Sequence, residues 1–534
     1  MMNSIQYHLQ EGVSIADAVK KKHADILTPA ALQFIVKLER EFGERRRTLM
    51  KKRQDRQNEI TIGKMPSFPK ETEHIRTSYW KASPIPYPLL NRRIELVGPP
   101  DAKTLVDGMN SSANVFVADF EDTFSPIWEN VVVGHSNIHD AIHGSLMYKD
   151  DEEQQHAIVQ NDVTLIVRPR GWHAIEKHIL VEGRPVSASL FDFGLFVFHN
   201  TQELRTQGKG PYVYLPKIEN HEEAKLWNDV FLMAQDELQI PQGTIKATVS
   251  IETFTAAFEI HEILYALREH CVGLQCNWWN YVFSFMKKVR HLSEYVVPDI
   301  QRLSTMTNFL HSLSLLTIQA SHKRGVHALA GPTTLHPVTL DGPHNEAMLI
   351  KIRVDKSREV EDGFDGTWIM HPAVLPITKM AFDEVLTEAN QLHRKREDVT
   401  LNEDDLLTVR RVENSIQDYQ STIRTLMEYI SLWLGGKGML IKNDVIVTAT
   451  EAEIARTQLW QWKHNVLRSR TELPVLTDEM YKKASGDELK KLLSVEKRKD
   501  MIDRYSVSKS ILYRLTLDRS FTEFFSMQTY NHID

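Results

Sequence analysis

The sequence is poor in cysteine and in long apolar runs. Its 534 residues include two cysteines, Cys271 and Cys276, too few for a disulfide framework in a chain of this length. Reduced thiols suit the cytoplasm, where we expect the protein to lie. No apolar run reaches the 18 residues that a membrane span needs, and the start, MMNSIQYHLQEG, lacks the features of an export signal. We therefore predict no membrane partner.

An excess of positive charge is also absent. The formal net charge of −7 gives no general attraction to a phosphate backbone. One basic stretch runs from Arg45 to Arg53, but Glu39, Glu41 and Glu44 are interleaved with its start. Such mixed charge is typical of a solvated helix face rather than a nucleic-acid patch. We predict a solvated face here and no nucleic-acid partner.

What is present indicates a folded chain of several modules. Hydrophobic residues make up 42% and charged residues 25%, as in globular proteins, and the length exceeds what one core usually organises. Thr28 and Pro29 predict a helix start, and apolar residues follow at helical spacing. Proline is frequent between residues 66 and 88, as in a linker. Residues 1–90 are therefore predicted to form a helical segment and linker.

Eight short β-prone runs follow, separated by helix-length segments. They are RIELVG from Arg93, NVFVADFED from Asn114, TLIVRPR from Thr164, YVYLPKIE from Tyr212, IKATVSIE from Ile245, CVGLQC from Cys271, GVHALAG from Gly325 and GTWIMHP from Gly366. This pattern predicts an α/β fold, a (β/α)₈ TIM barrel over residues 91–380. A doubly wound sheet is the weaker alternative, and no GxGxxG turn supports nucleotide binding. Residues 381–534 are predicted to form a C-terminal helical domain.

Most of these runs end in polar residues. They include Asp119, Glu121, Asp122, Arg168, Arg170, Lys217, Glu219, Glu252, Asn277, Asn280 and His371. The C-terminal ends of barrel strands build the active site of TIM-barrel enzymes. The pattern therefore favours an enzyme with its site at that face.

Longer motifs give the chain a resemblance to a known family. The run ATVSIETFTAAFEIHEILYALREHCVGLQCNWWNYVFSF from Ala247 is nearly gapless against the family pattern, and VADFEDTFSPIW, VRPRGWH, YLPKIENHEEAKLWNDVF, DGFDGTWIMHP and ARTQLWQW agree too. These blocks resemble malate synthases of the A-type. The resemblance implies condensation of acetyl-CoA with glyoxylate on Mg²⁺, followed by hydrolysis to malate and CoA.

The resemblance also implies roles for individual residues. Arg168 matches the cation that stabilises the enolate, although a strand-end arginine is also a common salt-bridge partner. Glu252 matches the first Mg²⁺ carboxylate, with a helix cap or a barrel salt bridge as the alternative. Asp119, Glu121 and Asp122 are expected to contact substrate, or the metal through water. The loop with Asn277, Trp278 and Trp279 is expected to contact glyoxylate. His371 and Pro372 are expected to contact CoA. The three acids have a simpler alternative as surface residues with a capping role.

Two of the positions that carry the chemistry depart from the family pattern. Asn280 stands where the second metal carboxylate is expected, which removes one negative charge and predicts weak Mg²⁺ binding. Thr448 stands at the position of the catalytic base, and a hydroxyl cannot accept a proton at neutral pH. Glu451, three residues on, completes a T-x-x-E capping box and is a possible substitute base, as is Asp444.

Two functions remain open from the sequence. One is an enzyme that makes malate, or a related product from an acyl-CoA and another 2-oxo acid, with weakened or changed activity. The other is a non-catalytic relative that binds acyl-CoA.

Overall fold

The structure of the chain is a computed structural model. It describes residues 11–16, 25–159, 162–292, 295, 308–335, 343–408, 416–442, 444–464 and 476–533.

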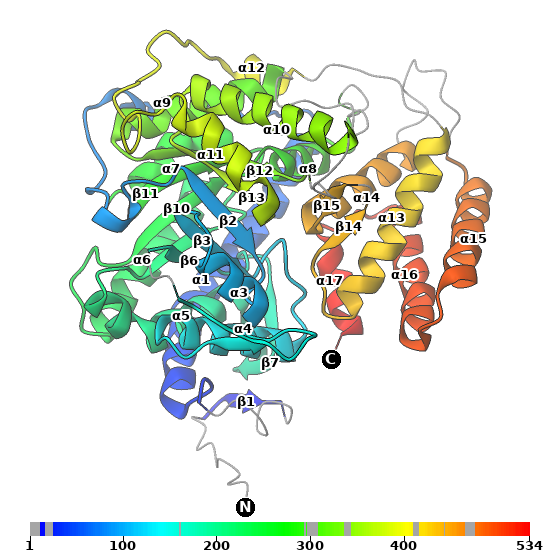
Figure 1. Cartoon of the computed structure of the whole chain (residues 1–534). Coiled ribbons are helices and arrows are strands. Elements are labelled where there is room, and N and C mark those ends of the chain that lie inside the picture. Colours follow the sequence, from blue (N-terminus) through cyan, green and yellow to red (C-terminus); the bar gives the residue numbers. More distant parts are fainter. Residues whose placement is uncertain are drawn as a thin grey trace, which may run out of the picture.

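A closed barrel of eight parallel strands forms the centre of the molecule (Figure 1). Each strand pairs with the next along the chain and the last pairs with the first, so the barrel has no open edge. The strands are β2 (Ile94–Gly98), β3 (Val115–Asp119), β6 (Thr164–Arg168), β9 (Tyr212–Leu215), β10 (Lys246–Ile251), β11 (Cys271–Cys276), β12 (His327–Thr333) and β13 (Gly366–Ile369). All eight predicted runs contain a barrel strand, which confirms the TIM barrel.

Helices cover the outside of the barrel (Figure 1). They are α3 (Ala102–Met109), α4 (Trp128–Ile142), α5 (Ala188–Thr206), α6 (His221–Glu237), α7 (Ile260–Ala266), α8 (Trp278–Lys288), α9 (Asn308–Arg324), α10 (Pro343–Asp362) and α11 (Leu375–Asp383). Two small sheets were not predicted: β1 (Val13–Ile15) with β7 (Ile175–Val181) and β8 (Arg184–Ser187), and the hairpin β4 (Met147–Lys149) with β5 (Gln155–Ala157). The linker holds the short helices α2 (Glu73–Thr77) and η2 (Tyr87–Leu89).

The barrel interior is filled by side chains. Glu95 on β2 accepts hydrogen bonds from Arg92 Nε at 2.6 Å, from the Tyr214 hydroxyl at 2.6 Å and from Trp368 Nε1 at 2.8 Å. Arg92, Glu95 and Tyr214 are fully buried, so the pairing offsets the cost of removing their charge and dipoles from water. The interior is a packed core, as is usual for this fold.

A long N-terminal helix, α1 (Pro29–Thr61), lies against the barrel helices α5 and α6. The Thr28 hydroxyl accepts from Ala31 N at 3.1 Å and Pro29 is the first helical residue, which confirms the predicted start. The prediction of a solvated basic face was wrong for Arg46 and Arg53, which are buried. Their neighbours in sequence are exposed or half-buried, and mixed charge in a sequence cannot tell which arginines face the barrel.

Arg53 joins α1 to the site end of the barrel. Its guanidinium makes two 2.7 Å bonds to the buried carboxylate of Glu223 on α6, and Nη2 donates to the Lys217 carbonyl at 2.6 Å. Arg46 donates to the carbonyls of Trp172 and Ala174, which follow β6. These arginines therefore hold backbone segments that follow two barrel strands.

The C-terminal module is helical and packs beside the barrel, at the right in Figure 1. It comprises α13 (Ile416–Leu434), the hairpin β14 (Leu440–Lys442) with β15 (Val445–Val447), α14 (Ala449–His464), α15 (Asp478–Val495), α16 (Lys499–Leu517) and α17 (Phe525–Thr529). The short helix α12 (Glu403–Leu407) precedes it and contacts α9. The module has a hydrophobic core of its own, which includes Trp433, Leu459 and Leu512.

Backbone contacts fix the start of α14 at the barrel mouth. Ala449 N donates to the Asp122 carbonyl at 3.1 Å, and Ile446 N donates to the Thr334 carbonyl at 2.8 Å. A Cβ atom at Gly438 would lie 2.2 Å from the Thr123 carbonyl oxygen, so only glycine permits this approach of the module to the turn after β3. The module is thereby placed over the ends of β3 and β12.

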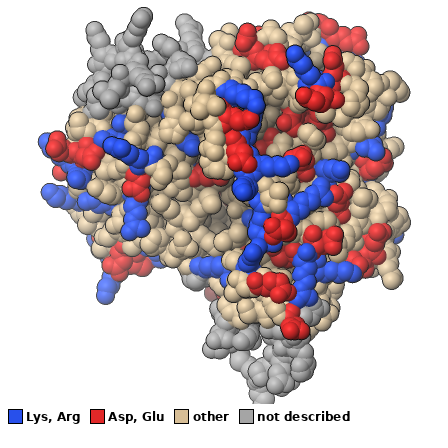
Figure 2. All heavy atoms as spheres, turned by 180° about the vertical axis from the view of Figure 1, so that it is seen from behind, with Lys and Arg blue, Asp and Glu red and all other residues tan. Residues whose placement is uncertain are grey.

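Basic and acidic side chains are mixed over the face seen in Figure 2. Among the residues that the structure describes, no helix combines the length and apolar character that would let it cross a membrane.

The Arg53 contact leads to a prediction on stability. Arg53→Ala leaves Glu223 buried without its partner, and we expect the free energy of unfolding to fall by about 3–5 kcal/mol. A lower urea midpoint would measure this. Lys52→Ala is the matched control, because Lys52 pairs with Glu222 on the exposed surface, where such a pair contributes about 0–1 kcal/mol. Equal shifts of the urea midpoint for the two variants would contradict the conclusion that Arg53 joins α1 to the barrel.

Candidate active site at the C-terminal mouth of the barrel

Arg168, the last residue of β6, lies at the centre of a buried charge cluster. Nη1 contacts Asp119 at 3.0 Å and Asp122 at 2.8 Å, and Nη2 contacts the two oxygens of Glu252 at 3.0 and 3.1 Å. Burial alone would lower the pKa of Arg168, but Asp122, Glu252 and Asp119 outweigh it and raise that pKa well above its ordinary value. Nε is buried and has no hydrogen-bond partner among the described residues. Arg168 is thus a permanent cation at the strand ends.

Asp119 organises the turn that carries the other two acids. Its carboxylate accepts the backbone N–H groups of Glu121, Asp122 and Thr123 at 2.9–3.2 Å. It also lies opposite Arg168 in the β3–β6 register. These bonds hold the turn after β3 rather than a helix end, since α4 begins at Trp128, and Asp119 and Asp122 are buried rather than on the surface. Asp119 therefore shapes the site.

Lys217, after β9, binds two of the carboxylates. Its Nζ lies 3.0 and 3.2 Å from the oxygens of Asp122 and 3.7 Å from Glu252, while its backbone N–H donates to Glu252 at 2.7 Å. Its φ of 55° is uncommon for a residue other than glycine and costs free energy, as is seen at functional sites. The Arg53 bond to its carbonyl helps to hold it. Burial would raise the pKa of Asp122, but Lys217 and Arg168 outweigh burial and keep it below its ordinary value.

Asn280, in the first turn of α8, faces the same carboxylates. Its Nδ2 donates to Asp122 and to Glu252, each at 2.8 Å, and its Oδ1 accepts from the Thr450 hydroxyl at 3.1 Å. Asn277 caps α8 and donates to Glu252 at 3.1 Å. Arg168 from β6, Lys217 after β9 and Asn280 from α8 therefore converge on the carboxylates of Asp122 and Glu252, and Thr450 from α14 contacts Asn280.

Thr448 and Glu451 lie at the start of α14. The Thr448 backbone N–H and hydroxyl both donate to Glu451 Oε2, at 2.8 and 2.6 Å, and the hydroxyl accepts from Thr450 N at 3.2 Å. This is the T-x-x-E cap that the sequence predicted. Burial raises the pKa of Glu451, and its bonds with Thr448 offset part of that effect. Asp444 lies in the turn between β14 and β15, with a φ of 62°.

Glu121 contacts the segment that follows β6. Its Oε2 accepts from Gly171 N at 2.7 Å, and its Oε1 lies 3.7 Å from His173 Nε2. Burial raises the pKa of Glu121 to about 7, although Lys217 opposes this. Burial also lowers the pKa of His173 well below its ordinary value, so the imidazole is neutral.

The other predicted site residues lie apart from this cluster. The Trp278 indole is buried and donates to Ser314 Oγ at 2.8 Å, and Trp279 is half-buried beside it in sequence. His371 and Pro372 begin the short helix η6 (Pro372–Val374) after β13, and Pro372 is exposed. Contacts of these four residues with substrate stay predictions.

Some site residues were not assigned a role from the sequence. Lys217 was noted as a strand-end residue, but its left-handed backbone has no signal in the sequence. Thr450 reaches Asn280 across 170 positions of the chain. Arg170, which the sequence analysis placed among the polar strand ends, is paired with Asp192 and Glu176 in a separate buried cluster.

Comparisons with known proteins assign the chain to a family. The malate synthase TIM barrel domain model matches residues 164–409, the malate synthase N-terminal domain matches 11–74 and the malate synthase C-terminal model matches 413–533. The malate synthase of Myxococcus xanthus (strain DK1622) is 41% identical over 528 residues, covering 98% of this chain and 97% of that protein. This chain belongs to the malate synthase family.

A second curated relative agrees with this assignment. Malate synthase A of Escherichia coli (strain K12) is 38% identical over 476 residues, or 89% of each protein. Among solved structures, the Haloferax volcanii malate synthase pyruvate/acetyl-CoA ternary complex is 14% identical, covers 76% of this chain and 98% of that chain, and has a TM-score of 0.45.

The resemblance to malate synthases implies Mg²⁺, a cation that takes one or two carboxylates and completes its shell with water. Asp122 and Glu252 fit this requirement, because the oxygens of both lie within hydrogen-bond distance of one Asn280 nitrogen. A half-turn of the amide would present Oδ1 instead, and the Thr450 hydroxyl can then accept rather than donate. No group of three His, Cys, Asp or Glu suitable for a metal occurs in the described part of the chain. The residues present therefore fit a Mg²⁺ ion held by two carboxylates.

Weak Mg²⁺ binding is the expected result of this set, because Asn280 adds no charge and Lys217 competes for both carboxylates. Asn280→Asp should tighten Mg²⁺ binding by at least about tenfold in calorimetry, since ligand charge sets affinity. Asn228→Asp, on α6, adds the same charge away from the site and should change nothing. Tight binding by the unmodified protein would contradict this prediction.

Proposed function

We propose that this chain condenses acetyl-CoA with glyoxylate, or with a related 2-oxo acid, at a rate below that of a site with a free carboxylate at position 448. Membership of the malate synthase family supports the reaction class. The observation that carries the lowered rate is the Thr448 hydroxyl bonded to Glu451, because it stands where the family pattern has the base. We propose that the protein acts in the cytoplasm.

Arg168 is the positive group that we assign to stabilising the enolate. Forming the enolate of an acyl thioester places negative charge on the carbonyl oxygen, and a fixed donor stabilises that charge without reorganisation. The Nη atoms of Arg168 are held by Asp119, Asp122 and Glu252, and Nε is the one guanidinium nitrogen without a hydrogen-bond partner among the described residues, which supports Arg168 as this donor. Mg²⁺, held by Asp122, Glu252 and Asn280, would polarise the aldehyde of the acceptor when bound.

The base that removes the methyl proton is missing from its expected position, which Thr448 occupies. Removal of a proton from a methyl group requires a carboxylate within hydrogen-bond reach. Glu451 is the nearest candidate in sequence, but its Oε2 already accepts two hydrogen bonds from Thr448 and completes the helix cap. Losing a general base typically costs roughly 100- to 10,000-fold in rate. We therefore expect slow enolate formation.

A second function is supported by the charge pairing. The carboxylates Asp122 and Glu252 are already matched by Arg168, Lys217 and Asn280, so the cluster is stable without a reacting ligand. A non-catalytic protein that binds acyl-CoA would keep this arrangement.

One experiment separates these functions. The unmodified protein should exchange the acetyl-CoA methyl protons with deuterated solvent very slowly, as followed by NMR. The double variant Thr448→Asp, Asn280→Asp should raise exchange and CoA release with glyoxylate by at least about 100-fold, because it restores both carboxylates.

Glu451→Gln is the control for this experiment. If the unmodified protein exchanges protons rapidly and Glu451→Gln abolishes the exchange, Glu451 is the base and the expectation of a slow reaction is wrong. If the double variant binds acetyl-CoA but still fails to turn over, the non-catalytic function is favoured.

A further inference from the structure

Two helices on the outside of the barrel carry apolar side chains that face solvent. The helices α10 and α11 pack against each other and lie side by side in Figure 1. Ile350 and Val354 on α10 are each 59% exposed, and Met380 on α11 is 51% exposed. Single apolar residues on a surface are ordinary, whereas apolar residues that adjoin one another mark an interaction surface. The relative positions of these three side chains therefore decide whether they form one surface.

Helical spacing and one ion pair show that these side chains adjoin. Ile350 and Val354 are four residues apart, so they lie on the same side of α10. Met380 and Glu384 are also four residues apart, and Glu384 N donates to the Met380 carbonyl at 3.1 Å, which continues the helical turn. Arg353, beside Val354, donates to Glu384 at 2.8 Å across the two helices. We call these five residues the α10–α11 face.

Both signs of charge lie on or beside this face. Arg353 pairs with Glu384, and Lys379 pairs with Asp383, which Arg93 also contacts. A strongly acidic or basic partner would need an excess of the opposite sign on the surface that it meets. A face that carries a cation and an anion side by side can instead meet a copy of itself, because a twofold axis sets each charge opposite the other kind.

A twofold axis through the pair formed by Arg353 and Glu384 gives a self-complementary contact. Across this axis, Arg353 of one copy lies opposite Glu384 of the other copy, and the reverse pairing follows by symmetry. The same operation sets α10 of one copy over α11 of the other, so Ile350 and Val354 meet Met380. The apolar side chains are then enclosed beside two ion pairs between the copies.

The size of the two helices sets the expected strength of such a contact. The 20 residues of α10 span about 30 Å, and two packed helices are about 20 Å wide, which gives roughly 600 Å² for each copy. Standard interfaces bury about 800 Å² on each partner, and smaller ones are weak and transient. The contact is therefore expected to be reversible, with a dissociation constant of about 1–100 µM.

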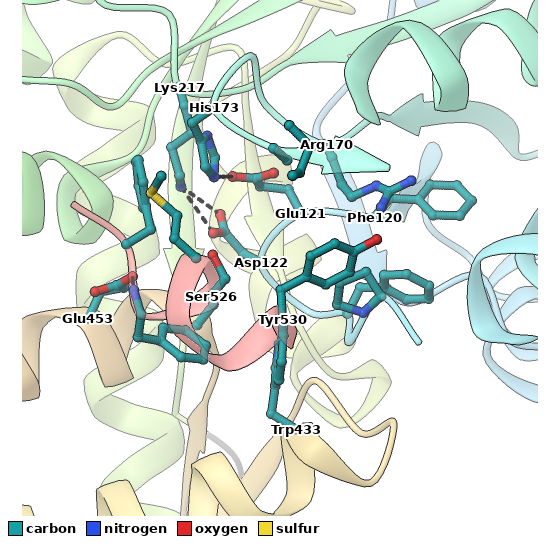
Figure 3. A pocket seen from close by; sticks show the side chains of 18 of the residues that line it. Phe120, Glu121, Asp122, Arg170, His173, Lys217, Trp433, Glu453, Ser526 and Tyr530 are labelled. Carbon is teal, nitrogen blue, oxygen red and sulfur yellow. Dashed lines mark hydrogen bonds and ion pairs between the residues drawn. The ribbon is translucent and has the colours of Figure 1, made fainter. Parts of the chain in front are cut away.

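We propose that the α10–α11 face binds a second copy of this chain and forms a reversible twofold dimer. The face is separate from the candidate active site. Within the described residues, the cavity of about 270 Å³ beside Asp122 and Lys217 (Figure 3) takes no lining residue from α10 or α11. The dimer therefore needs neither acetyl-CoA nor glyoxylate, and it does not depend on the proposed function.

Sedimentation equilibrium of the full chain tests the proposal. Over about 1–100 µM the mass should rise from 61.7 kDa toward twice that value. Val354→Asp should weaken the dimer at least about tenfold, because it would place a charge in the apolar contact. Val495→Asp is the matched control, since Val495 ends α15, is 72% exposed and lies outside the face. A monomer at every concentration overturns the proposal, as does an equal effect of the two variants.

Charge reversal tests the twofold pairing. Arg353→Glu and Glu384→Arg each set like charges opposite each other across the axis, and each alone should weaken the dimer at least about tenfold. An equimolar mixture of the two variants should dimerise at least about tenfold more tightly than either alone, because each copy then meets the opposite charge. Loss of the ion pair within one chain cannot produce this recovery. Circular dichroism like that of the unmodified protein shows that the variants are folded, and no recovery on mixing overturns the proposal.

Discussion

The buried guanidinium of Arg168 is the interaction on which the rest of the site depends. Removing one cation and three carboxylates from water is costly unless the groups pair closely. Arg168 meets Asp119, Asp122 and Glu252, and each of these then fixes another segment. Asp119 holds the turn after β3, the Asp122 carbonyl holds the start of α14, and Glu252 holds the Lys217 backbone.

The same pairing explains how two altered positions are tolerated. An aspartate at position 280 would bring a third carboxylate toward Asp122 and Glu252, which requires a cation or a proton. Asn280 instead donates to both and so stabilises the cluster by itself. At position 448, threonine keeps the helix cap with Glu451. The fold therefore does not require a carboxylate at position 280 or at position 448.

The N-terminal helix contributes to the site from a distance. Arg53 binds the carbonyl of Lys217, a residue held with a positive φ. Strain of this kind persists only where surrounding contacts over-determine the backbone. Arg53, Glu223 and the β9 end thus form one support for the Lys217 ammonium, and through it for Asp122.

The sequence by itself determined the barrel, because eight apolar runs with helix-length segments between them can pair as parallel strands. It also determined the helix starts at Thr28 and Thr448, because a helix cap is a local hydrogen bond. It also located the polar strand ends that meet at one face. Only the tertiary structure decided which side chains meet: Lys217 contacts the carboxylates, Thr450 donates to the Asn280 amide oxygen, and Trp278 donates to Ser314. It also decided that Arg46 and Arg53 are buried. These outcomes depend on contacts between segments far apart in the chain, and on backbone angles that side-chain identity does not specify.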